Sequence, residues 1–230
     1  GVFGILMSRY SNADDSLFST IYNGRNDSRL ENTVCMLVKT LPVYCRFEQK
    51  TTIQAYMTEL SGQLLSSMAN DIFPFSDICA KYGFNSDLTF AYQAELSDDY
   101  PIGDTVARGH DLSLDIAKMP LLIQVREYNN EYVLTAEFRS DMYSDAFVDG
   151  MLDAYEAAMD SVLKNKYVSE VSIISENAVK KIAEFNDTAC EYDRAKTISD
   201  RFAEMVQTIP DHTAVVFKDK KFTYKELDEI

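Results

Sequence analysis

The sequence has no tryptophan, two histidines, five prolines and eight glycines among its 230 residues. It also lacks any run near the ~18–20 apolar residues that span a bilayer. The apolar opening, residues 1–7, has neither a basic region nor a cleavage site and does not begin with Met. We therefore expect no membrane span and no signal peptide, and we expect the chain to come from inside a larger protein.

The chain has fewer basic than acidic residues: 22 Lys and Arg compared with 37 Asp and Glu, which gives a formal net charge of -15. Such a chain repels phosphate backbones, so nucleic-acid binding is not expected. No basic amphipathic stretch suggests binding to an anionic membrane. The acidic excess promotes solubility and identifies no partner.

Cysteine is also scarce, and the four residues are Cys35, Cys45, Cys79 and Cys190. None of their spacings matches a zinc knuckle, and only two histidines could assist them, so no metal site is expected. A chain of this size with 46% hydrophobic residues has a core that needs no disulfide frame. We expect reduced thiols and a cytoplasmic protein.

Hydrophobic patterns in the first half predict helices and strands in mixed order. A buried helix covers residues 3–10, a strand covers 17–22, and a second strand covers 34–47. This second strand lies at an edge or is bent, because it contains Pro42. Thr51 and Gln54 form a capping-box pattern before an amphipathic helix that ends near Asn70. A strand over 86–96 and a polar loop over 97–109 follow.

The second half contains the clearest local signal, a hairpin of two alternating segments, 121–126 and 132–138. Asn129 and Asn130 suit the left-handed conformations of its turn. Ser144 can cap a long helix that ends near 164–166. Its predicted apolar face is Phe147, Met151, Tyr155, Ala158 and Val162.

The pattern changes after Tyr167. A short apolar piece, a small helix through Ile182 and the polar stretch 186–196 are typical of an interdomain linker. A helix around Phe202, a strand over 214–217 and a capping box of Thr223 and Glu226 come next. Strands and helices without strict alternation predict an α/β (α+β) fold, a two-layer mixed sheet with helices.

No complete catalytic motif is visible: there is no phosphate-binding loop, G-x-S-x-G elbow or H-E-x-x-H. His110 and Asp111 are adjacent and rarely face one another, so we interpret them as loop residues. His212 is expected at the surface. Lys39 is expected there too, because a lysine is usually a solvated surface residue. Residues 71–75 are interpreted as an apolar core anchor.

Several segments in a fixed order resemble the condensation domains of nonribosomal peptide synthetases. Residues 33–43, ending in Thr40-Leu41-Pro42-Val43, resemble the family's "vGmfvNTLPlR" segment. The other similar segments are 3–10 with 14–15 and 23–25, 71–75, 87–93, and the linker-like 185–192. Residues 198–202, 210–217 and 222–227 resemble the opening of the adenylation domain that follows. Each motif alone is weak, but the linker followed by this opening is specific.

The resemblance implies three parts: a C-terminal condensation lobe over 1–166, a linker over 167–197, and a truncated adenylation start over 198–230. The fold it implies is one lobe of the chloramphenicol-acetyltransferase-like architecture. The function it implies is support of amide-bond formation between carrier-bound acyl or peptidyl and aminoacyl thioesters.

The resemblance also implies the partners: an N-terminal condensation lobe, an adenylation domain and peptidyl carrier domains. Phosphopantetheine would be carried by those carrier domains, and ATP with Mg²⁺ would serve only the rest of the adenylation domain. The family's His-His-x-x-x-Asp-Gly motif is absent, so no catalytic residue is assigned and the isolated chain is expected to be inactive. The tunnel-wall candidates are Lys39, Thr40 and Asp87.

Two departures from the family pattern bear on activity: Lys39 replaces an Asn, and Cys35 replaces a Gly. Three alternatives therefore stay open. One is a non-catalytic carrier-docking module, a second is a coenzyme A-dependent acyltransferase of the same fold, and a third is a structural surface for self-association.

Overall fold

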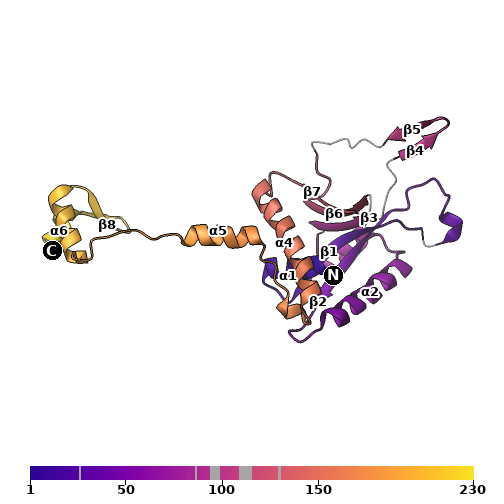
Figure 1. Cartoon of the computed structure of the whole chain (residues 1–230), viewed down its shortest axis with the longest axis horizontal. Helices are drawn as coiled ribbons and strands as arrows, with labels where there is room; N and C mark the ends of the chain where they lie inside the picture. Colours follow the sequence, from indigo (N-terminus) through magenta and orange to yellow (C-terminus); the bar gives the residue numbers. More distant parts are fainter. Residues whose placement is uncertain (26, 86, 94–98, 109–115, 129–130) are drawn as a thin grey trace. The chain divides into compact units, whose positions relative to one another are not determined.

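The structure is a computed structural model that describes residues 1–25, 27–85, 87–93, 99–108, 116–128 and 131–230 (Figure 1). The chain divides into two compact units, Gly1–Ile182 and Ala183–Ile230, which we describe separately. None of the described helices has the length and apolar character needed to cross a membrane.

A five-stranded mixed sheet organises the first unit, with strand order β2-β1-β3-β6-β7. Its strands are β1 (Asp15–Tyr22), β2 (Lys39–Arg46), β3 (Leu88–Gln93), β6 (Leu121–Tyr128) and β7 (Glu131–Phe138). The three central strands β1, β3 and β6 are parallel, and β2 and β7 pair antiparallel at the two edges. Of the two possibilities predicted for Pro42, an edge strand or a bend, the structure shows the edge strand β2, where the missing N–H is tolerated.

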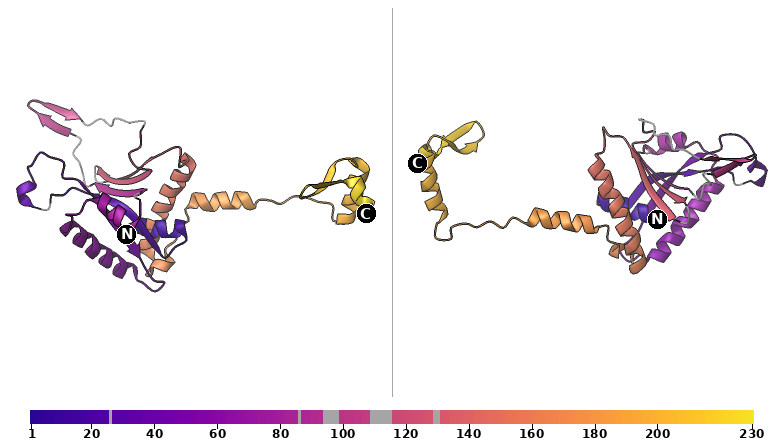
Figure 2. Two further views of the ribbon diagram at one scale, coloured as in Figure 1. Left: turned by 180° about the vertical axis from the view of Figure 1, so that it is seen from behind. Right: turned by 45° about the horizontal axis from the view of Figure 1, so that its top comes forward.

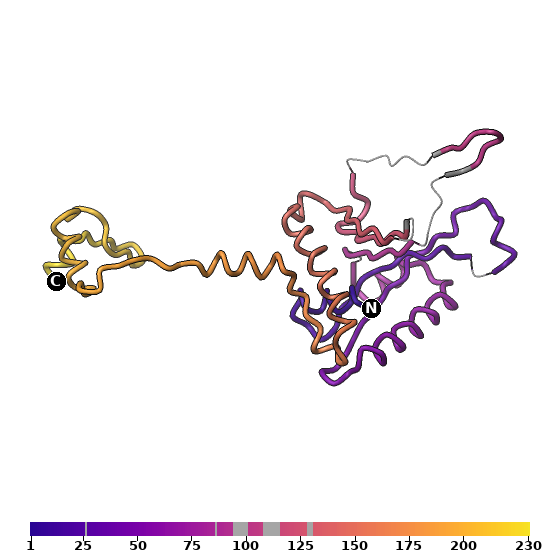
Figure 3. Tube along the Cα trace, viewed as in Figure 1, coloured from indigo at the N-terminus to yellow at the C-terminus, as the bar shows by residue number. Residues whose placement is uncertain are grey.

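Helices complete this unit, and Figure 3 follows the chain from α1 into β1 and back along β2. They are α1 (Val2–Ser11), α2 (Ile53–Ala69), α3 (Phe75–Tyr82), α4 (Asp145–Lys164), and the short η1 (Ser28–Leu30) and η2 (Val168–Glu170). Helix α5 (Glu176–Asn186) follows and crosses the boundary between the units.

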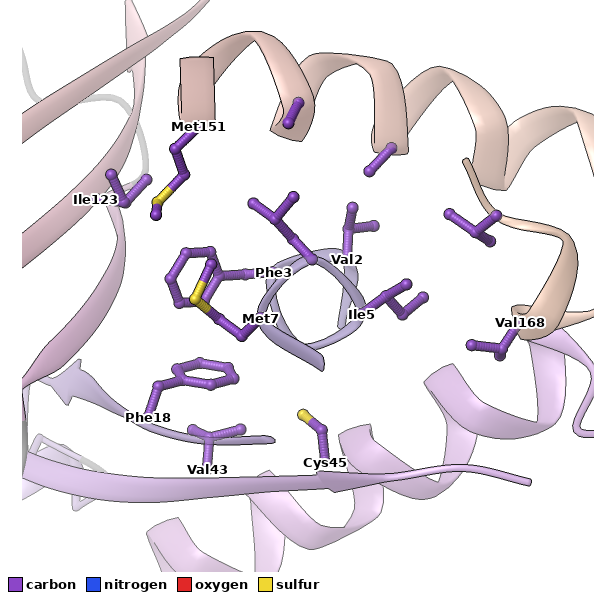
Figure 4. Packing of buried hydrophobic residues seen from close by; sticks show 14 of the residues in the cluster. Val2, Phe3, Ile5, Met7, Phe18, Val43, Cys45, Ile123, Met151 and Val168 are labelled. Atoms are coloured by element: carbon purple, nitrogen blue, oxygen red, sulfur yellow. The ribbon is translucent and has the colours of Figure 1, made fainter. Parts of the chain in front are cut away.

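The core surrounds α1, whose residues from Val2 to Ser8 are all buried. Figure 4 shows α1 end-on between α4 and the strands, and Figure 2 shows from two further sides that α1 lies beside α4. The ring of Phe3 packs edge-on against the ring of Phe18, with centroids 4.9 Å apart, and stacks on the ring of Phe90, with centroids 5.1 Å apart. A helix that is apolar all round needs cover on every side, which explains its central place.

A small polar pair joins the central strands. The hydroxyls of Ser19 on β1 and Thr89 on β3 lie 2.8 Å apart, and both side chains are buried. Thr20 donates its hydroxyl to the Phe90 carbonyl at 2.8 Å. Because buried hydroxyls need partners, these contacts fix β1 beside β3, where the strands share few paired residues.

Four local expectations need correction. Thr52, not Thr51, caps α2 by accepting from the Ala55 N–H, while Thr51 accepts from Glu48. The segment 97–109 is not only a loop, since β4 (Asp99–Ile102) and β5 (Thr105–Arg108) form a hairpin that turns at Gly103, where φ is +59°. A glycine readily adopts this left-handed conformation, and strands of only four residues leave little periodic signal.

The other two corrections concern β2 and α4. Strand β2 begins only at Lys39, so residues 34–38 are outside it. The buried residues of α4 are Val148, Met151, Ala154 and Ala158, whereas Phe147 is 41% exposed. The α4 cap is Ser144 as predicted, and the β6–β7 pairing is confirmed, but Asn129 and Asn130 lie outside the described residues.

The second unit contains α6 (Ile198–Thr208), β8 (Thr213–Phe217), β9 (Lys220–Thr223) and α7 (Tyr224–Asp228). Strands β8 and β9 form an antiparallel hairpin, and Phe202 contacts Tyr224 at a ring distance of 5.9 Å. Thr223 and Glu226 form the predicted capping box. The elements predicted for this region are confirmed.

Candidate functional site

Lys39 and Thr40, two of the predicted tunnel-wall residues, lie together at the start of β2. They pair with Tyr22 and Ile21 at the end of β1. Both line a cavity of about 310 Å³ together with Val38, Leu41 and the loop 71–75. Residues 71–74 belong to the connection between α2 and α3, and Phe75 begins α3. The cavity is therefore lined by the start of β2 and by this helix connection.

Lys39 is held in this cavity by Asp71. Its ammonium lies 2.9 Å from the Asp71 Oδ1 and donates to the Asp71 backbone carbonyl at 2.8 Å. The Asp71 side chain is only 18% exposed, so the pair is partly shielded from water. The Lys39–Asp71 ion pair therefore holds the segment 71–75 to β2. Two apolar side chains of this segment are nevertheless exposed, Ile72 at 81% and Phe73 at 68%. The predicted apolar core anchor is wrong for these two side chains.

Asp87, the third candidate, is not among the residues that line this cavity. It is exposed just before β3, and its backbone carbonyl accepts from the Leu121 N–H at 3.1 Å. The backbone of Asp87 therefore takes part in the hydrogen bonding between the start of β3 and the start of β6. A role for it at a tunnel wall stays a prediction.

Ionisable groups with perturbed pKa values lie outside the cavity. Burial raises the pKa of the Cys45 thiol and of the Tyr56 hydroxyl, both of which pack against α1. Hydrogen bonds from Arg139 lower the pKa of Asp141 at the surface. Perturbed groups often mark catalytic sites, but these three have structural causes.

The histidines and cysteines add no reactive cluster. His110 and Asp111 lie outside the described residues, and His212 is exposed in the second unit, as predicted. All four cysteines are described and are free thiols. Among the described residues no group of His, Cys, Asp and Glu is placed to hold a metal ion.

A larger groove of about 750 Å³, which no sequence pattern indicated, lies between α4 and the sheet. Its sheet side is formed by Phe90, Tyr92, Val125, Tyr132 and Leu134. Its helix side is formed by Tyr155, Glu156, Met159 and Asp160. The predicted apolar face of α4 already included Tyr155, and Tyr132 and Leu134 belong to the predicted hairpin segment 132–138. The sequence did not show that these side chains come together between α4 and the sheet, because that depends on tertiary packing.

Comparison with known proteins places most of the chain in one family. The sequence model described as "Condensation domain" matches residues 1–183. Gramicidin S synthase 2 of Brevibacillus brevis is 28% identical over 99% of the chain, and surfactin synthase subunit 1 of Bacillus subtilis is 25% identical over 97%. The chain spans only 5% and 7% of these two relatives.

Solved structures show the same fold. A four-domain nonribosomal peptide synthetase bound to AMP and glycine matches 98% of the chain with a TM-score of 0.73 at 15% identity, and the match covers 19% of that structure. The starter condensation domain of a rhizomide synthetase mutant matches 74% of the chain with a TM-score of 0.64 at 12% identity, which covers 42% of that domain. Condensation domains have the chloramphenicol-acetyltransferase-like fold, so the predicted mixed α/β architecture is confirmed. By its family match over more than half its length, the chain belongs to the Condensation domain family.

Proposed function

We propose that the chain is the C-terminal half of a condensation domain over 1–166, a linker over 167–197, and the start of an adenylation domain over 198–230. The match of the Condensation family to residues 1–183 is the observation that carries this proposal. Support for the second part comes from the four-domain synthetase, whose match covers 98% of the chain and so extends past the family match.

The proposed activity of the parent module is amide formation between two carrier-bound thioesters. The amine of a downstream aminoacyl group attacks the carbonyl carbon of an upstream thioester. A C–N bond forms, the C–S bond breaks, and the upstream phosphopantetheine leaves as a thiol after the amine nitrogen loses a proton. Positioning of the two arms supplies much of the acceleration in such a reaction.

We assign this chain a supporting role without a catalytic residue of its own. Lys39 and Thr40 would form part of a wall beside the substrate path, with Lys39 held by Asp71. The proposed partners are the N-terminal lobe, the adenylation domain and peptidyl carrier domains. ATP and Mg²⁺ would act only in the rest of the adenylation domain. The free thiols favour a reducing compartment, so we propose the cytoplasm.

The test measures amide formation with loaded donor and acceptor carriers, in the parent module and in the 230-residue chain. We expect product from the module and none from the chain alone. Product from the chain alone would refute the supporting role and make His110 the next residue to replace. A module that binds both carriers and forms no product would instead favour the non-catalytic docking module. Transfer from a soluble coenzyme A thioester, but not from a carrier, would favour the acyltransferase alternative.

A further inference from the structure

The groove between α4 and the sheet is an open side of the hydrophobic core. Phe90, Leu134 and Tyr155 line the groove and also pack against the buried cluster around α1. Phe90 stacks on the buried Phe3 at 5.1 Å and lies 5.9 Å from the ring of Tyr155. The floor of the groove is therefore continuous with the core.

Burial decreases stepwise along the strands that form this floor. Phe90 on β3 is paired with Ile123 on β6, which is 1% exposed. In the next row with side chains on this face, Tyr92 is paired with Val125, and Tyr92 is 54% exposed. Tyr132, further along β7, is 70% exposed. The apolar face thus continues beyond the region that α1 and α4 cover, and exposed apolar surface of this kind usually has a partner.

Negative charge surrounds the open part of the groove. Glu156 and Asp160 lie one turn apart on α4, and both are exposed. Lys164 is 4.0 Å from Asp160, with both side chains more than 70% exposed, so this pair is weak. Tyr92 donates its hydroxyl to a third carboxylate, Glu127, at 3.2 Å. A partner that places a Lys or Arg here complements these charges.

We infer that this groove binds an apolar segment, carrying a basic residue, from the part of the condensation domain that lies outside this chain. The inference rests on the proposed function, and it specifies where the rest of the domain docks. The matched starter condensation domain provides the length argument, because more than half of it lies outside the match. A volume of about 750 Å³ also suits a small ligand, but the continuity of the floor with the core favours polypeptide packing.

The first test compares thiol labelling at two positions of α4 in the complete condensation domain of the parent synthetase. Met159→Cys reports on the groove, and Leu163→Cys, one turn later and outside it, is the matched control. Cys35, Cys79 and Cys190 are replaced by Ser in both variants. In this chain Met159 is 43% exposed and Leu163 is 84% exposed. An open groove would therefore give rates within about a factor of two to three of each other.

We expect Met159→Cys to react with a maleimide at least about tenfold more slowly than Leu163→Cys in the complete domain. Rates within threefold of each other would overturn the inference. A second copy as the occupant would also overturn it. This would appear as protection of Met159→Cys in the 230-residue chain that rises with protein concentration, together with a doubled mass in light scattering.

The second test uses charge and does not depend on labelling. Glu156→Lys, facing the groove, should lower the Tm of the complete domain by several degrees more than Asp149→Lys, an exposed change of equal charge on the same helix. Equal shifts would count against a basic partner at this position. Amide formation is scored separately. Protection of Met159→Cys without product preserves this inference and contradicts the proposed activity, whereas product without protection does the reverse.

Discussion

Lys39 and Asp71, which are 32 positions apart in the sequence, form an ion pair whose nitrogen and oxygen lie 2.9 Å apart. The same ammonium donates to the backbone carbonyl of Asp71 at 2.8 Å. One side chain therefore joins the edge strand β2 to the connection between α2 and α3. The position at which this chain departs from the family's Asn thus has a defined structural role.

Replacing Lys39 by Met should lower the free energy of unfolding by about 1 kcal/mol, because it leaves the mostly buried Asp71 carboxylate without its ion-pair partner. Urea unfolding measures this change. The variant Lys39→Met/Asp71→Asn should lose less than the sum of the two single changes, since the second change removes the unpaired charge. Additive losses would show that the pair contributes no coupling energy.

Gly4 on α1 faces Cys45 of β2 and Tyr56 of α2. A methyl group at this position would overlap the Cys45 Sγ and would lie 2.8 Å from the Tyr56 hydroxyl oxygen. Gly4→Ala should therefore destabilise the protein by about 1–3 kcal/mol through overpacking, measured by thermal or urea unfolding.

Gly62 on α2 is the matched control, because a methyl group there would meet nothing within 4 Å. Gly62→Ala should leave stability unchanged or raise it by up to about 1 kcal/mol, since alanine favours the helix. A similar loss from both substitutions would contradict the close contact at Gly4.

Alkaline pH should destabilise the protein through Cys45. Burial raises the pKa of its thiol, so the folded state retains a proton that the unfolded chain releases above a pKa of about 8.5. The resulting stabilisation is complete below this unfolded pKa and is lost as the pH rises through the folded pKa. Unfolding free energies at pH 8, 9 and 10 should fall less steeply in Cys45→Ala than in the parent chain. Cys35→Ala, at an exposed position, should retain the parent slope.

The four thiols should react at different rates with a disulfide reagent. Cys35 and Cys190 are exposed, Cys79 is partly buried, and Cys45 is 1% exposed. We expect two fast thiols, one slower, and a fourth that reacts only in denaturant, because reaction requires an accessible thiolate. Cys45→Ser should leave the number of fast thiols unchanged, and a loss of one fast thiol would place Cys45 at the surface.

Much of the local structure was predictable because it depends on short-range patterns. Alternating residues identified the β6–β7 pair, and the apolar spacing behind Thr52 identified α2. The cap of α2 was misplaced by one residue, since Thr51 and Thr52 have equivalent side chains. The hairpin of β4 and β5 was missed because its short strands have no apolar periodicity.

Local patterns specify the helices other than α3, η1 and η2, most strands, an edge or a bend at Pro42, and the family resemblance, because each depends on residues close together along the chain. Three-dimensional packing places β3 between β1 and β6, brings Lys39 to Asp71, and gathers β3, β7 and α4 around one groove. These contacts join residues that are distant in sequence. Their choice depends on which faces can be buried together, which no local pattern specifies.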